Sequence, residues 1–332
     1  AVFLLIKSWI CTNFARQTNE RMPAKPQQTT SHILMIRPAN FGFNEQTAQN
    51  NAFQQDDSRY SSKQIRERAI EEFDAFAQLL QLSGVNVILV NDTKSPRKTD
   101  AVFPNNWVSF HEDGTVVTYP MFAPTRRKER REEVIALLAK RFQIERRMHL
   151  EKYESEQKFL ESTGSMVLDR QHKIAYACRS DRTDEGPLAE FCETLGYEQV
   201  VFNAVDANRV PVYHTNVMMA LGETFAIICL DTISDAKERK MVRQKLEQTG
   251  KAIISITMAQ LHAFAGNMLQ VRNRSGDPLL VMSQQAYESL NKDQIYLLHQ
   301  HTNLLYSPLE VIELYGGGSA RCMMAEVFLP ER

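Results

Sequence analysis

The sequence predicts an α/β fold in which one unit, a β-hairpin followed by a helix and a further strand, is repeated around a closed ring. Apolar runs of strand length alternate with stretches of helical periodicity along most of the 332 residues. Polar residues near the start of successive hairpins recur every 53 to 55 residues, a period typical of repeat architectures. The last apolar run has no partner after it in the sequence, so we expect it to pair with the first strand and leave no open edge.

The composition fits a soluble globular chain without a highly charged partner. The chain is 43% hydrophobic and 24% charged, and its 39 basic and 40 acidic side chains nearly cancel. A net charge near zero gives no indication of binding to nucleic acid or to an anionic membrane. The five cysteines are odd in number and form no C-x-x-C pair, which indicates neither a disulfide framework nor a zinc ribbon. We therefore expect a reducing compartment and a cytoplasmic location.

Residues 1–30 differ in composition from the rest of the chain. Their apolar run, 2–10, is too short to span a bilayer, and the polar remainder is basic with a single acid. Such a segment is either the remnant of a targeting peptide or a gene-start artefact, since Met22 is a plausible first residue. We predict that residues 1–30 are a disordered extension, which leaves organelle targeting open, and that residues 31–332 form a single domain.

The first unit supplies the strand that closes the ring. Residues 32–36 are an apolar run stopped by Pro38, which predicts a buried strand. Residues 62–83 place apolar side chains on one face at helical spacing, and Gly84 follows as a C-terminal cap. Residues 85–90 are predicted to be the next strand.

Hairpin, helix and strand then recur along the chain. Short polar turns join the two strands of each hairpin, and the charged run 126–133 is interpreted as a solvated helix face. The predicted hairpins are 107–119, 165–177, 216–230 and 268–283; the predicted helices are 125–142, 188–195 and 234–248, with a helical stretch ending near His299; the predicted following strands are 199–204 and 251–256. The final run, 323–329, is the expected partner of the first strand.

Equivalent positions of the repeats carry residues of complementary chemistry. Asn106, Glu161, His214, Asn267 and Cys322 are separated by 55, 53, 53 and 55 residues. In a closed five-fold array such positions face one central axis, so we expect these side chains to converge. A thiol, an imidazole and a carboxylate are the groups that cysteine catalysis requires. A nearby imidazolium would also favour the reactive thiolate.

Cys322 is the residue on which this interpretation depends. Three consecutive glycines, 316–318, precede it, and the mostly apolar run 323–328 follows it. Glycines allow the backbone to approach another group closely or to turn at positive φ. Taken alone, a single cysteine is more often a small buried filler, which is our interpretation of the cysteines within the predicted strands and helices. The series of complementary residues favours a nucleophile at Cys322.

Four motifs resemble those of the guanidino-group-modifying superfamily, also called the amidinotransferase or pentein superfamily, and most closely its citrulline-utilisation hydrolase branch. They are Phe-Pro-Asn-Asn-Trp at 103–107, Leu-Glu-Ser-Thr-Gly-Ser at 160–165, His-Thr-Asn-Val at 214–217, and the segment 316–323. The resemblance covers about residues 31–330.

This resemblance implies a five-bladed pentein α/β propeller with pseudo-five-fold repeats, forming one catalytic domain over residues 31–332. It implies that Cys322 is the nucleophile, His214 the general acid/base and Glu161 the catalytic carboxylate. It also implies a small ureido or guanidino substrate, no metal and no organic cofactor.

Two asparagines indicate the charge of the substrate. In arginine deiminases, which this chain is similar to in layout, two further carboxylates hold the cationic guanidinium. The corresponding places here hold Asn106 and Asn216, with Asn105 as an alternative to Asn106. An amide suits a neutral planar group, whereas a buried guanidinium without counter-charges would cost on the order of several kcal/mol. We therefore predict a neutral ureido substrate such as citrulline.

Three other positions are candidates for substrate binding. Arg37 and Asn51 follow the first strand, where a loop at the mouth of the ring could grip an α-carboxylate or an α-amine. Arg37 suits a carboxylate, and a structural ion pair is the equal alternative. Backbone N–H groups of the glycine loop, including that of Gly317, could steady developing charge.

The sequence therefore predicts a cysteine-dependent hydrolase that acts on a ureido or guanidino C–N bond of a small amino acid through a covalent intermediate on Cys322. An arginine deiminase, a dimethylarginine hydrolase or an amidinotransferase of the same superfamily is the alternative. A non-catalytic binding protein is disfavoured by the retained thiol, imidazole and carboxylate. No nucleic-acid or membrane partner is expected, and the sequence leaves a homo-oligomer open.

Overall fold

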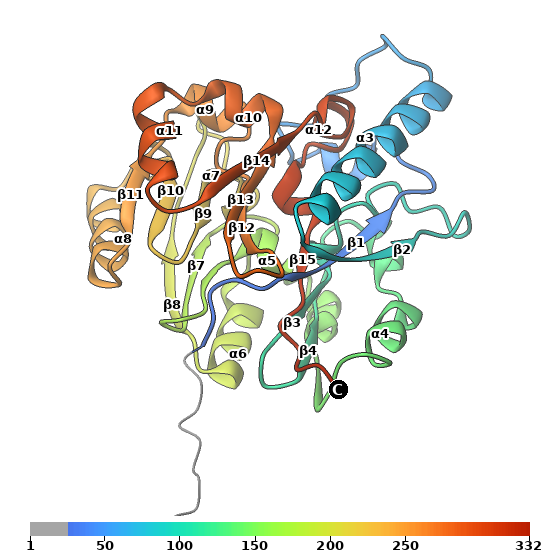
Figure 1. Cartoon of the computed structure of the whole chain (residues 1–332), viewed down its shortest axis with the longest axis horizontal. Coiled ribbons are helices and arrows are strands. Elements are labelled where there is room, and N and C mark those ends of the chain that lie inside the picture. Colours follow the sequence, from blue (N-terminus) through green and yellow to red (C-terminus); the bar gives the residue numbers. More distant parts are fainter. Residues whose placement is uncertain (1–25) are drawn as a thin grey trace, which may run out of the picture.

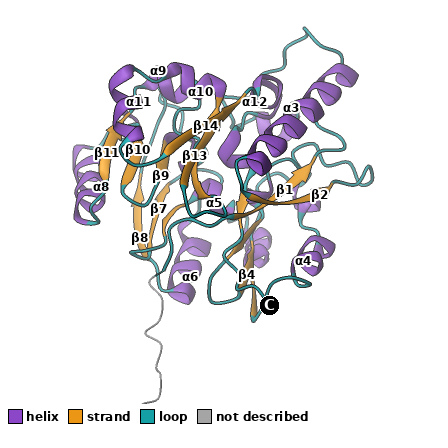
Figure 2. Ribbon diagram, viewed as in Figure 1, coloured by secondary structure: helices purple, strands orange, loops and turns teal. Residues whose placement is uncertain are grey.

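The computed structural model describes residues 26–332, and its architecture is a set of five small β-sheets with helices around them (Figure 1, Figure 2). Each sheet has three strands. In every sheet the central strand is antiparallel to one neighbour and parallel to the other. The repeated unit that the sequence predicts is therefore present as a repeated sheet.

Four of these sheets are each built from one continuous stretch of chain. A hairpin supplies the antiparallel pair, and a longer connection leads to the parallel strand. The sheets are β3 (Val108–Phe110), β4 (Thr115–Thr118) and β5 (Arg146–His149); β6 (Val167–Asp169), β7 (Ile174–Cys178) and β8 (Glu198–Phe202); β9 (Met219–Leu221), β10 (Phe225–Ile228) and β11 (Ala252–Ser255); and β12 (Leu269–Arg272), β13 (Pro278–Ser283) and β14 (Asn303–Ser307).

The fifth sheet joins the two ends of the described chain. Strand β1 (His32–Arg37) lies between β2 (Asn86–Asn91), to which it is parallel, and β15 (Ala325–Glu326), to which it is antiparallel. The blue and red segments meet at this sheet in Figure 1. The predicted pairing between the last apolar run and the first strand is therefore present.

Helix α3 (Ser62–Leu82) covers the fifth sheet. Ser61 and Gln64 form a capping box at its start, which satisfies free N–H groups of the first turn. The buried side chains of the helix recur at helical spacing and pack in the same apolar cluster as Ile33 and Met35 of β1.

The other helices are shorter. Among the described residues, no helix has the length and apolar content needed to cross a membrane. The helices are α2 (Glu45–Ala48), α4 (Glu132–Leu138), α5 (Ser162–Ser165), α6 (Glu185–Leu195), α7 (Thr215–Met218), α8 (Ala236–Gln248), α9 (Met258–His262), α10 (Gln284–Ser289), α11 (Lys292–His299) and α12 (Glu310–Gly316), with 3-10 turns η2 (Pro104–Asn106), η3 (Arg126–Glu129), η4 (Leu150–Glu156), η5 (Leu230–Thr232) and η6 (Ala320–Met323).

The interpretation of the charged run 126–133 as a solvated face is wrong at its start. The helix predicted at 125–142 is divided into η3 and α4, and Arg126 is only 3% exposed. Arg126 turns inward because Glu129 accepts two hydrogen bonds from its guanidinium and is itself buried. A charged pair of this kind is stable inside a protein only when its polar atoms are satisfied.

The predicted extension, residues 1–30, is too long at its C-terminal end. Gln28 and Thr29 are buried, and the Gln28 side chain donates to the carbonyl of Leu168 while accepting from the backbone N–H of Arg170. Residues 26–30 therefore belong to the folded part. Residues 1–25 lie outside the described residues.

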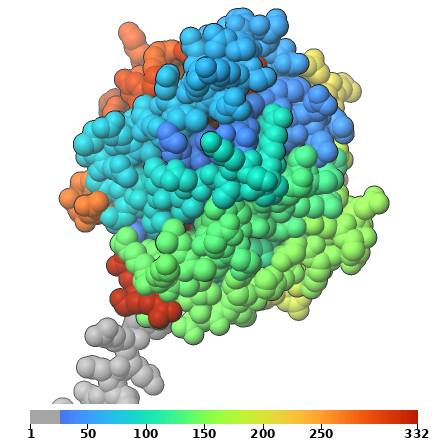
Figure 3. Space-filling view, turned by 90° about the vertical axis from the view of Figure 1, so that its right-hand side faces the viewer, coloured from blue at the N-terminus to red at the C-terminus, as the bar shows by residue number. Residues whose placement is uncertain are grey.

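Buried apolar side chains form four clusters between the sheets and the helices. The first strands of neighbouring units contact one another: β15 contacts β3, β6 contacts β9, and β9 contacts β12. Figure 3 shows one face of the molecule that is formed mainly by the N-terminal half of the chain, with the last residues at its edge. The starts of these units, which we call their heads, therefore pack against one another.

Candidate active site

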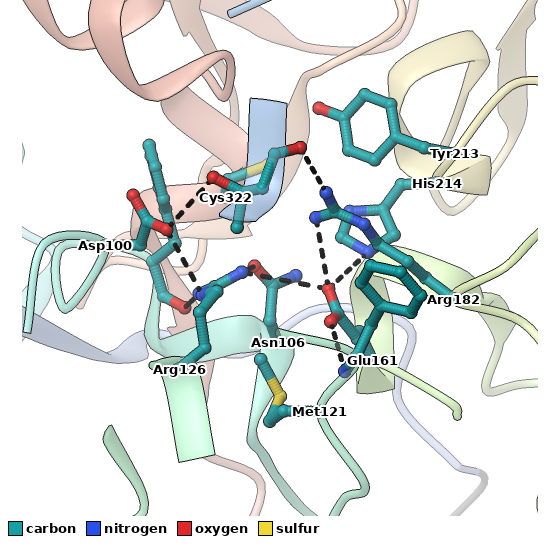
Figure 4. A network of polar contacts seen from close by, with 12 residues as sticks. Asp100, Asn106, Met121, Arg126, Glu161, Arg182, Tyr213, His214 and Cys322 are labelled. Carbon is teal, nitrogen blue, oxygen red and sulfur yellow. Dashed lines mark hydrogen bonds and ion pairs between the residues drawn. The ribbon is translucent and has the colours of Figure 1, made fainter. Parts of the chain in front are cut away.

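The five repeat-related residues lie close together, and each is at most 3% exposed. His214 Nε2 is 2.9 Å from Glu161 Oε2, and Asn267 Nδ2 is 3.3 Å from the sulfur of Cys322. Asn106, His214 and Cys322 line one cavity. Figure 4 shows Asn106, Glu161, His214 and Cys322 in this arrangement. The structure thus brings together residues that are separated by up to four repeats in the sequence.

Glu161 and His214 each lie at the start of a single helical turn, α5 and α7 respectively. The N–H groups of Gly164 and Ser165 in α5 donate to the carbonyl of Glu161, and the N–H of Val217 in α7 donates to the carbonyl of His214. These turns explain why the strands predicted to begin at 165 and 216 begin later, at β6 and β9.

Gly164 allows the units to approach one another. A Cβ at this position would overlap the amide nitrogen of Asn106 and lie 2.8 Å from His214 Cε1. We expect Gly164→Ala to lower hydrolytic activity at least about tenfold and to reduce the free energy of unfolding by about 1–3 kcal/mol, as overpacking does. Activity assays and urea unfolding measure the two effects. Gly42→Ala, where a Cβ meets nothing within 4 Å, is the matched control and should change neither.

The Glu161–His214 pair combines an ionised carboxylate with a neutral imidazole. Burial opposes ionisation of Glu161, but Arg182, the hydrogen bond with His214, and Arg126 together hold the pKa of this carboxyl well below its ordinary value. Burial lowers the pKa of His214 to about 4, and the adjacent Glu161 offsets this only in part. Near neutral pH, His214 is therefore uncharged and able to accept a proton.

This state of His214 predicts a loss of stability on the acid side. Between its ordinary pKa of 6.5 and about 4, the unfolded chain binds a proton at this residue and the folded chain does not. Stability should therefore hold above pH 6.5 and fall as the pH drops toward 4, on the order of 2–3 kcal/mol from this group. Urea unfolding at several pH values measures the slope. His111 adds a slope of the same sign because burial lowers its pKa too.

The contribution of His214 is isolated by comparison with His214→Gln, which cannot titrate in this range. The variant should show a shallower decrease in unfolding free energy between pH 6.5 and 4 than the wild type. Equal slopes in the two proteins would contradict a neutral, buried His214.

Two amides and the glycine loop surround the sulfur of Cys322. The Nδ2 atoms of Asn267 and Asn216 lie 3.3 and 3.6 Å from it. The carbonyl of Gly317, which has a positive φ of 63°, accepts hydrogen bonds from Tyr213 Oη at 2.6 Å and Asn51 Nδ2 at 3.3 Å. Gly317 and Asn51, two of the residues predicted to bind substrate, both line the cavity.

The structure separates the two candidate asparagines of the Phe-Pro-Asn-Asn-Trp motif. Asn106 lines the cavity, where its Oδ1 accepts from Arg126 and its Nδ2 has no hydrogen-bond partner among residues 26–332. The Asn105 side chain is instead directed to Thr163 Oγ1, at 3.3 Å, and does not line the cavity.

Arg37 is not brought to the cavity. Its guanidinium makes two hydrogen bonds with Asp74 of α3, at 2.7 and 2.8 Å, and the pair is partly exposed. This is the structural ion pair that the sequence leaves open as the alternative for Arg37.

Four cavity residues with a charged or phenolic side chain are not predicted from the sequence: Asp100, Arg126, Arg182 and Tyr213. Arg182 lies 3.5 Å from Glu161 and donates to the carbonyl of Thr47, and the ring of Tyr213 lies 5.0 Å from its guanidinium (Figure 4). None of the four falls in the repeat series, so periodicity gives no signal for them. Of the four, only Tyr213 has a local signal in the sequence, because it directly precedes His214 of the His-Thr-Asn-Val motif.

Comparison with known families identifies the relationship. Residues 37–329 match the family of eukaryotic N,N-dimethylarginine dimethylhydrolases. The chain belongs to this family. This family lies within the pentein, or amidinotransferase, superfamily, and its members are hydrolases that act on guanidino C–N bonds. No curated protein matches the chain significantly.

Solved structures share the fold at low sequence identity. The arginine dihydrolase ArgZ of cyanobacteria is 18% identical with a TM-score of 0.71; the similarity covers 90% of this chain and 41% of that one, so the chain spans less than half of that protein. AgrE, solved in a complex with L-arginine, is 19% identical with a TM-score of 0.69 over 91% of this chain and 40% of that one. The dimethylarginine dimethylhydrolase of Pseudomonas aeruginosa, solved with citrulline, is 15% identical with a TM-score of 0.63, covering 90% and 99%.

Proposed function

We propose that the protein is a cysteine-dependent hydrolase that cleaves a C–N bond in the ureido group of a small, citrulline-like amino acid through a covalent intermediate on Cys322. The observation that carries this proposal is the meeting of three groups at one cavity: the thiol of Cys322, the neutral imidazole of His214, and the carboxylate of Glu161 that is hydrogen-bonded to that imidazole.

The reaction follows from the protonation states. His214 takes the proton of the Cys322 thiol, and the thiolate attacks the central carbon of the substrate to give a tetrahedral adduct. The C–N bond then breaks, and the imidazolium of His214 gives its proton to the departing amine. Water, deprotonated by the same imidazole, cleaves the S-carbamoyl intermediate and releases the thiolate. Glu161 orients the imidazole and stabilises its charged form.

A neutral reacting group is supported by the surroundings of Glu161. This carboxylate is already opposed by Arg182 at 3.5 Å and by Arg126 at 3.7 Å, so it offers little free charge to a guanidinium. The unpartnered Nδ2 of Asn106 is a donor suited to the oxygen of a ureido group.

Asp100 is suited to the amino end of the substrate. It lines the cavity, and its Oδ2 accepts from Asn44 at 2.7 Å, while its Oδ1 has no hydrogen-bond partner in the described part of the chain. Burial raises the pKa of Asp100, with the charge of Arg126 opposing this effect. An ammonium group bound here would restore the ionised carboxylate and satisfy the free oxygen.

Substrate entry requires movement of the cavity wall. The cavity holds about 10 Å³, which is room for a single water. The side chains of Asn51 and Tyr213 both donate to the carbonyl of Gly317, and all three residues line the cavity, so we expect these contacts to change when an amino acid enters.

A methylated arginine is the second candidate, because the family assignment is to dimethylarginine dimethylhydrolases and Asp100 adds a carboxylate that the sequence argument lacks. Arginine itself belongs to the same alternative. Because the thiol chemistry is shared, the products distinguish these substrates.

The test is incubation of the purified chain with citrulline, arginine or asymmetric dimethylarginine, while ornithine, ammonia, dimethylamine and citrulline are quantified. Release of ornithine from citrulline supports the neutral-substrate proposal. Turnover of a guanidinium substrate with no turnover of citrulline would overturn it in favour of the second candidate. Added glycine separates the amidinotransferase alternative, since a transferase would form an amidino-glycine product.

The arrangement of the five sheets as the blades of a propeller is part of the same proposal. It is supported by the contacts between first strands and by the closure of β15 on β1. The cytoplasmic location stays a prediction from the sequence, which makes no prediction of the oligomeric state.

A further inference from the structure

The side chain of Asn267 is held in a fixed orientation against the sulfur of Cys322. Its Nδ2 donates to the carbonyl of Asn216 at 2.9 Å and to Cys322 Sγ at 3.3 Å, while its Oδ1 accepts from the backbone N–H of Arg321 at 3.1 Å. The residue is fully buried. Because a backbone N–H donates to Oδ1 and a carbonyl accepts from Nδ2, the nitrogen end of the amide is the end that faces the sulfur.

The backbone conformation of the residues before Asn267 contributes to the position of its side chain. Phe264 has a positive φ of 60°, which is unusual for a bulky residue, and its carbonyl accepts from the N–H of Asn267 at 2.8 Å. A Cβ on Gly266 would overlap the carbonyl of Val217, so only glycine permits this approach to the His214 unit. Local strain and a required glycine together place one amide beside the thiol.

We propose that Asn267 is a catalytic residue, whose amide N–H stabilises the thiolate of Cys322. The inference rests on the proposed function, in which Cys322 is the nucleophile. When the proton of the thiol passes to His214, a negative sulfur forms in a water-poor site, and a fixed N–H donor 3.3 Å away lowers the cost of that charge. The sulfur becomes neutral when its bond to the substrate carbon forms.

The same donor acts a second time in the reaction. When water cleaves the S-carbamoyl intermediate, the carbon–sulfur bond breaks and the electron pair returns to sulfur as thiolate. The amide of Asn267 is already in place for this leaving group. The second amide, of Asn216, has Nδ2 at 3.6 Å and Oδ1 at 3.9 Å from the sulfur, so its orientation toward the thiolate is less defined.

Other charged and titratable groups also face this site, and they are the same residues in the wild type and in a variant at 267. The groups that share the cavity with Cys322 or act on it electrostatically are Asp100, Arg126, Arg182, Tyr213, His214 and Arg321. A difference between variants at 267 therefore reports the amide itself.

The test compares the wild type with Asn267→Asp and Asn267→Ala by measuring alkylation with iodoacetamide across pH. Alkylation needs the thiolate and no substrate. Asn267→Asp replaces the donor by a carboxylate of the same shape, and we expect its alkylation rate at neutral pH to fall at least about tenfold, with the titration midpoint moved upward. Asn267→Ala removes the donor without adding charge, and a fall of about threefold is expected.

Cys322→Ala provides the background. Burial raises the pKa values of Cys178, Cys192 and Cys229 to about 11, 12 and 11, so these thiols react slowly at neutral pH. Asn86→Asp is the matched control, because Asn86 lies outside the cavity and pairs with Arg274. Its alkylation profile should equal that of the wild type.

Thermal unfolding shows which variants are folded. If Asn267→Asp does not fold, the alkylation profile of Asn267→Ala tests the role of Asn267. A folded 267 variant with the alkylation profile of the wild type would overturn the role of Asn267. Full hydrolytic activity in Cys322→Ala would instead overturn the proposed function, so the two failures are distinguishable.

Discussion

Cys322→Ala is expected to abolish hydrolysis, with a loss of at least about 10⁴-fold in kcat/KM, while the protein stays folded. Without the sulfur no covalent intermediate can form, and the imidazole of His214 has no thiol to deprotonate. The substitution removes one buried atom, and Asn267 keeps its bond to the carbonyl of Asn216, so the stability cost should be within about 1–2 kcal/mol.

Acid quenching followed by mass spectrometry of the intact protein measures the intermediate directly. With citrulline, the wild type should carry a carbamoyl group on Cys322; with a guanidinium substrate, the adduct would retain the amino acid. Cys192→Ala, a buried cysteine in another apolar cluster, is the control and should keep full activity. Activity in Cys322→Ala comparable to that of the wild type would refute the nucleophile.

Glu161→Gln is expected to impair both activity and stability. The Gln amide can still hydrogen-bond to His214, but it cannot stabilise the imidazolium, so kcat should fall by about 10²–10⁴-fold. Arg182 and Arg126 also lose a buried counter-charge, for which the expected cost is on the order of 3–5 kcal/mol. The two effects have one cause, the removal of a single negative charge from the centre of the site.

Steady-state kinetics and urea unfolding separate these two effects. The matched control is Glu223→Gln, because Glu223 also pairs with an arginine, Arg272, but lies outside the cavity. It should cost some stability and leave kcat unchanged. If Glu161→Gln folded and kept at least half of the wild-type kcat, the carboxylate would have no role in the reaction.

The convergence of Asn106, Glu161, His214, Asn267 and Cys322 could be predicted because each occupies the same place in a repeated unit. In a repeat protein, residues at equivalent places of successive units lie at equivalent places in space, and the five sheets follow the same period. The closing contact of β15 with β1 was predictable for a related reason, since an apolar strand without a partner leaves an open edge.

The charged network around these residues could not be predicted in this way. Asp100 and Arg182 occupy no repeated position, and Arg126 belongs to a charged run whose local pattern is that of a solvated helix. Arg126 is buried with Glu129 of its own turn, and Asn106 and Glu161 meet the pair from other parts of the chain. An ion pair inside a protein depends on partners in three dimensions, and sequence spacing carries no information about them.

The chain sequence thus accounts for the repeated unit, the pairing of the last strand with the first, and the meeting of Cys322, His214 and Glu161. The tertiary structure alone distinguishes Asn106 from Asn105, pairs Arg37 with Asp74 and aims the amide of Asn267 at the sulfur. The physical reason is that periodicity and apolar patterning are local properties of the chain. Side-chain orientation is decided by the hydrogen-bond partners that folding brings from other units.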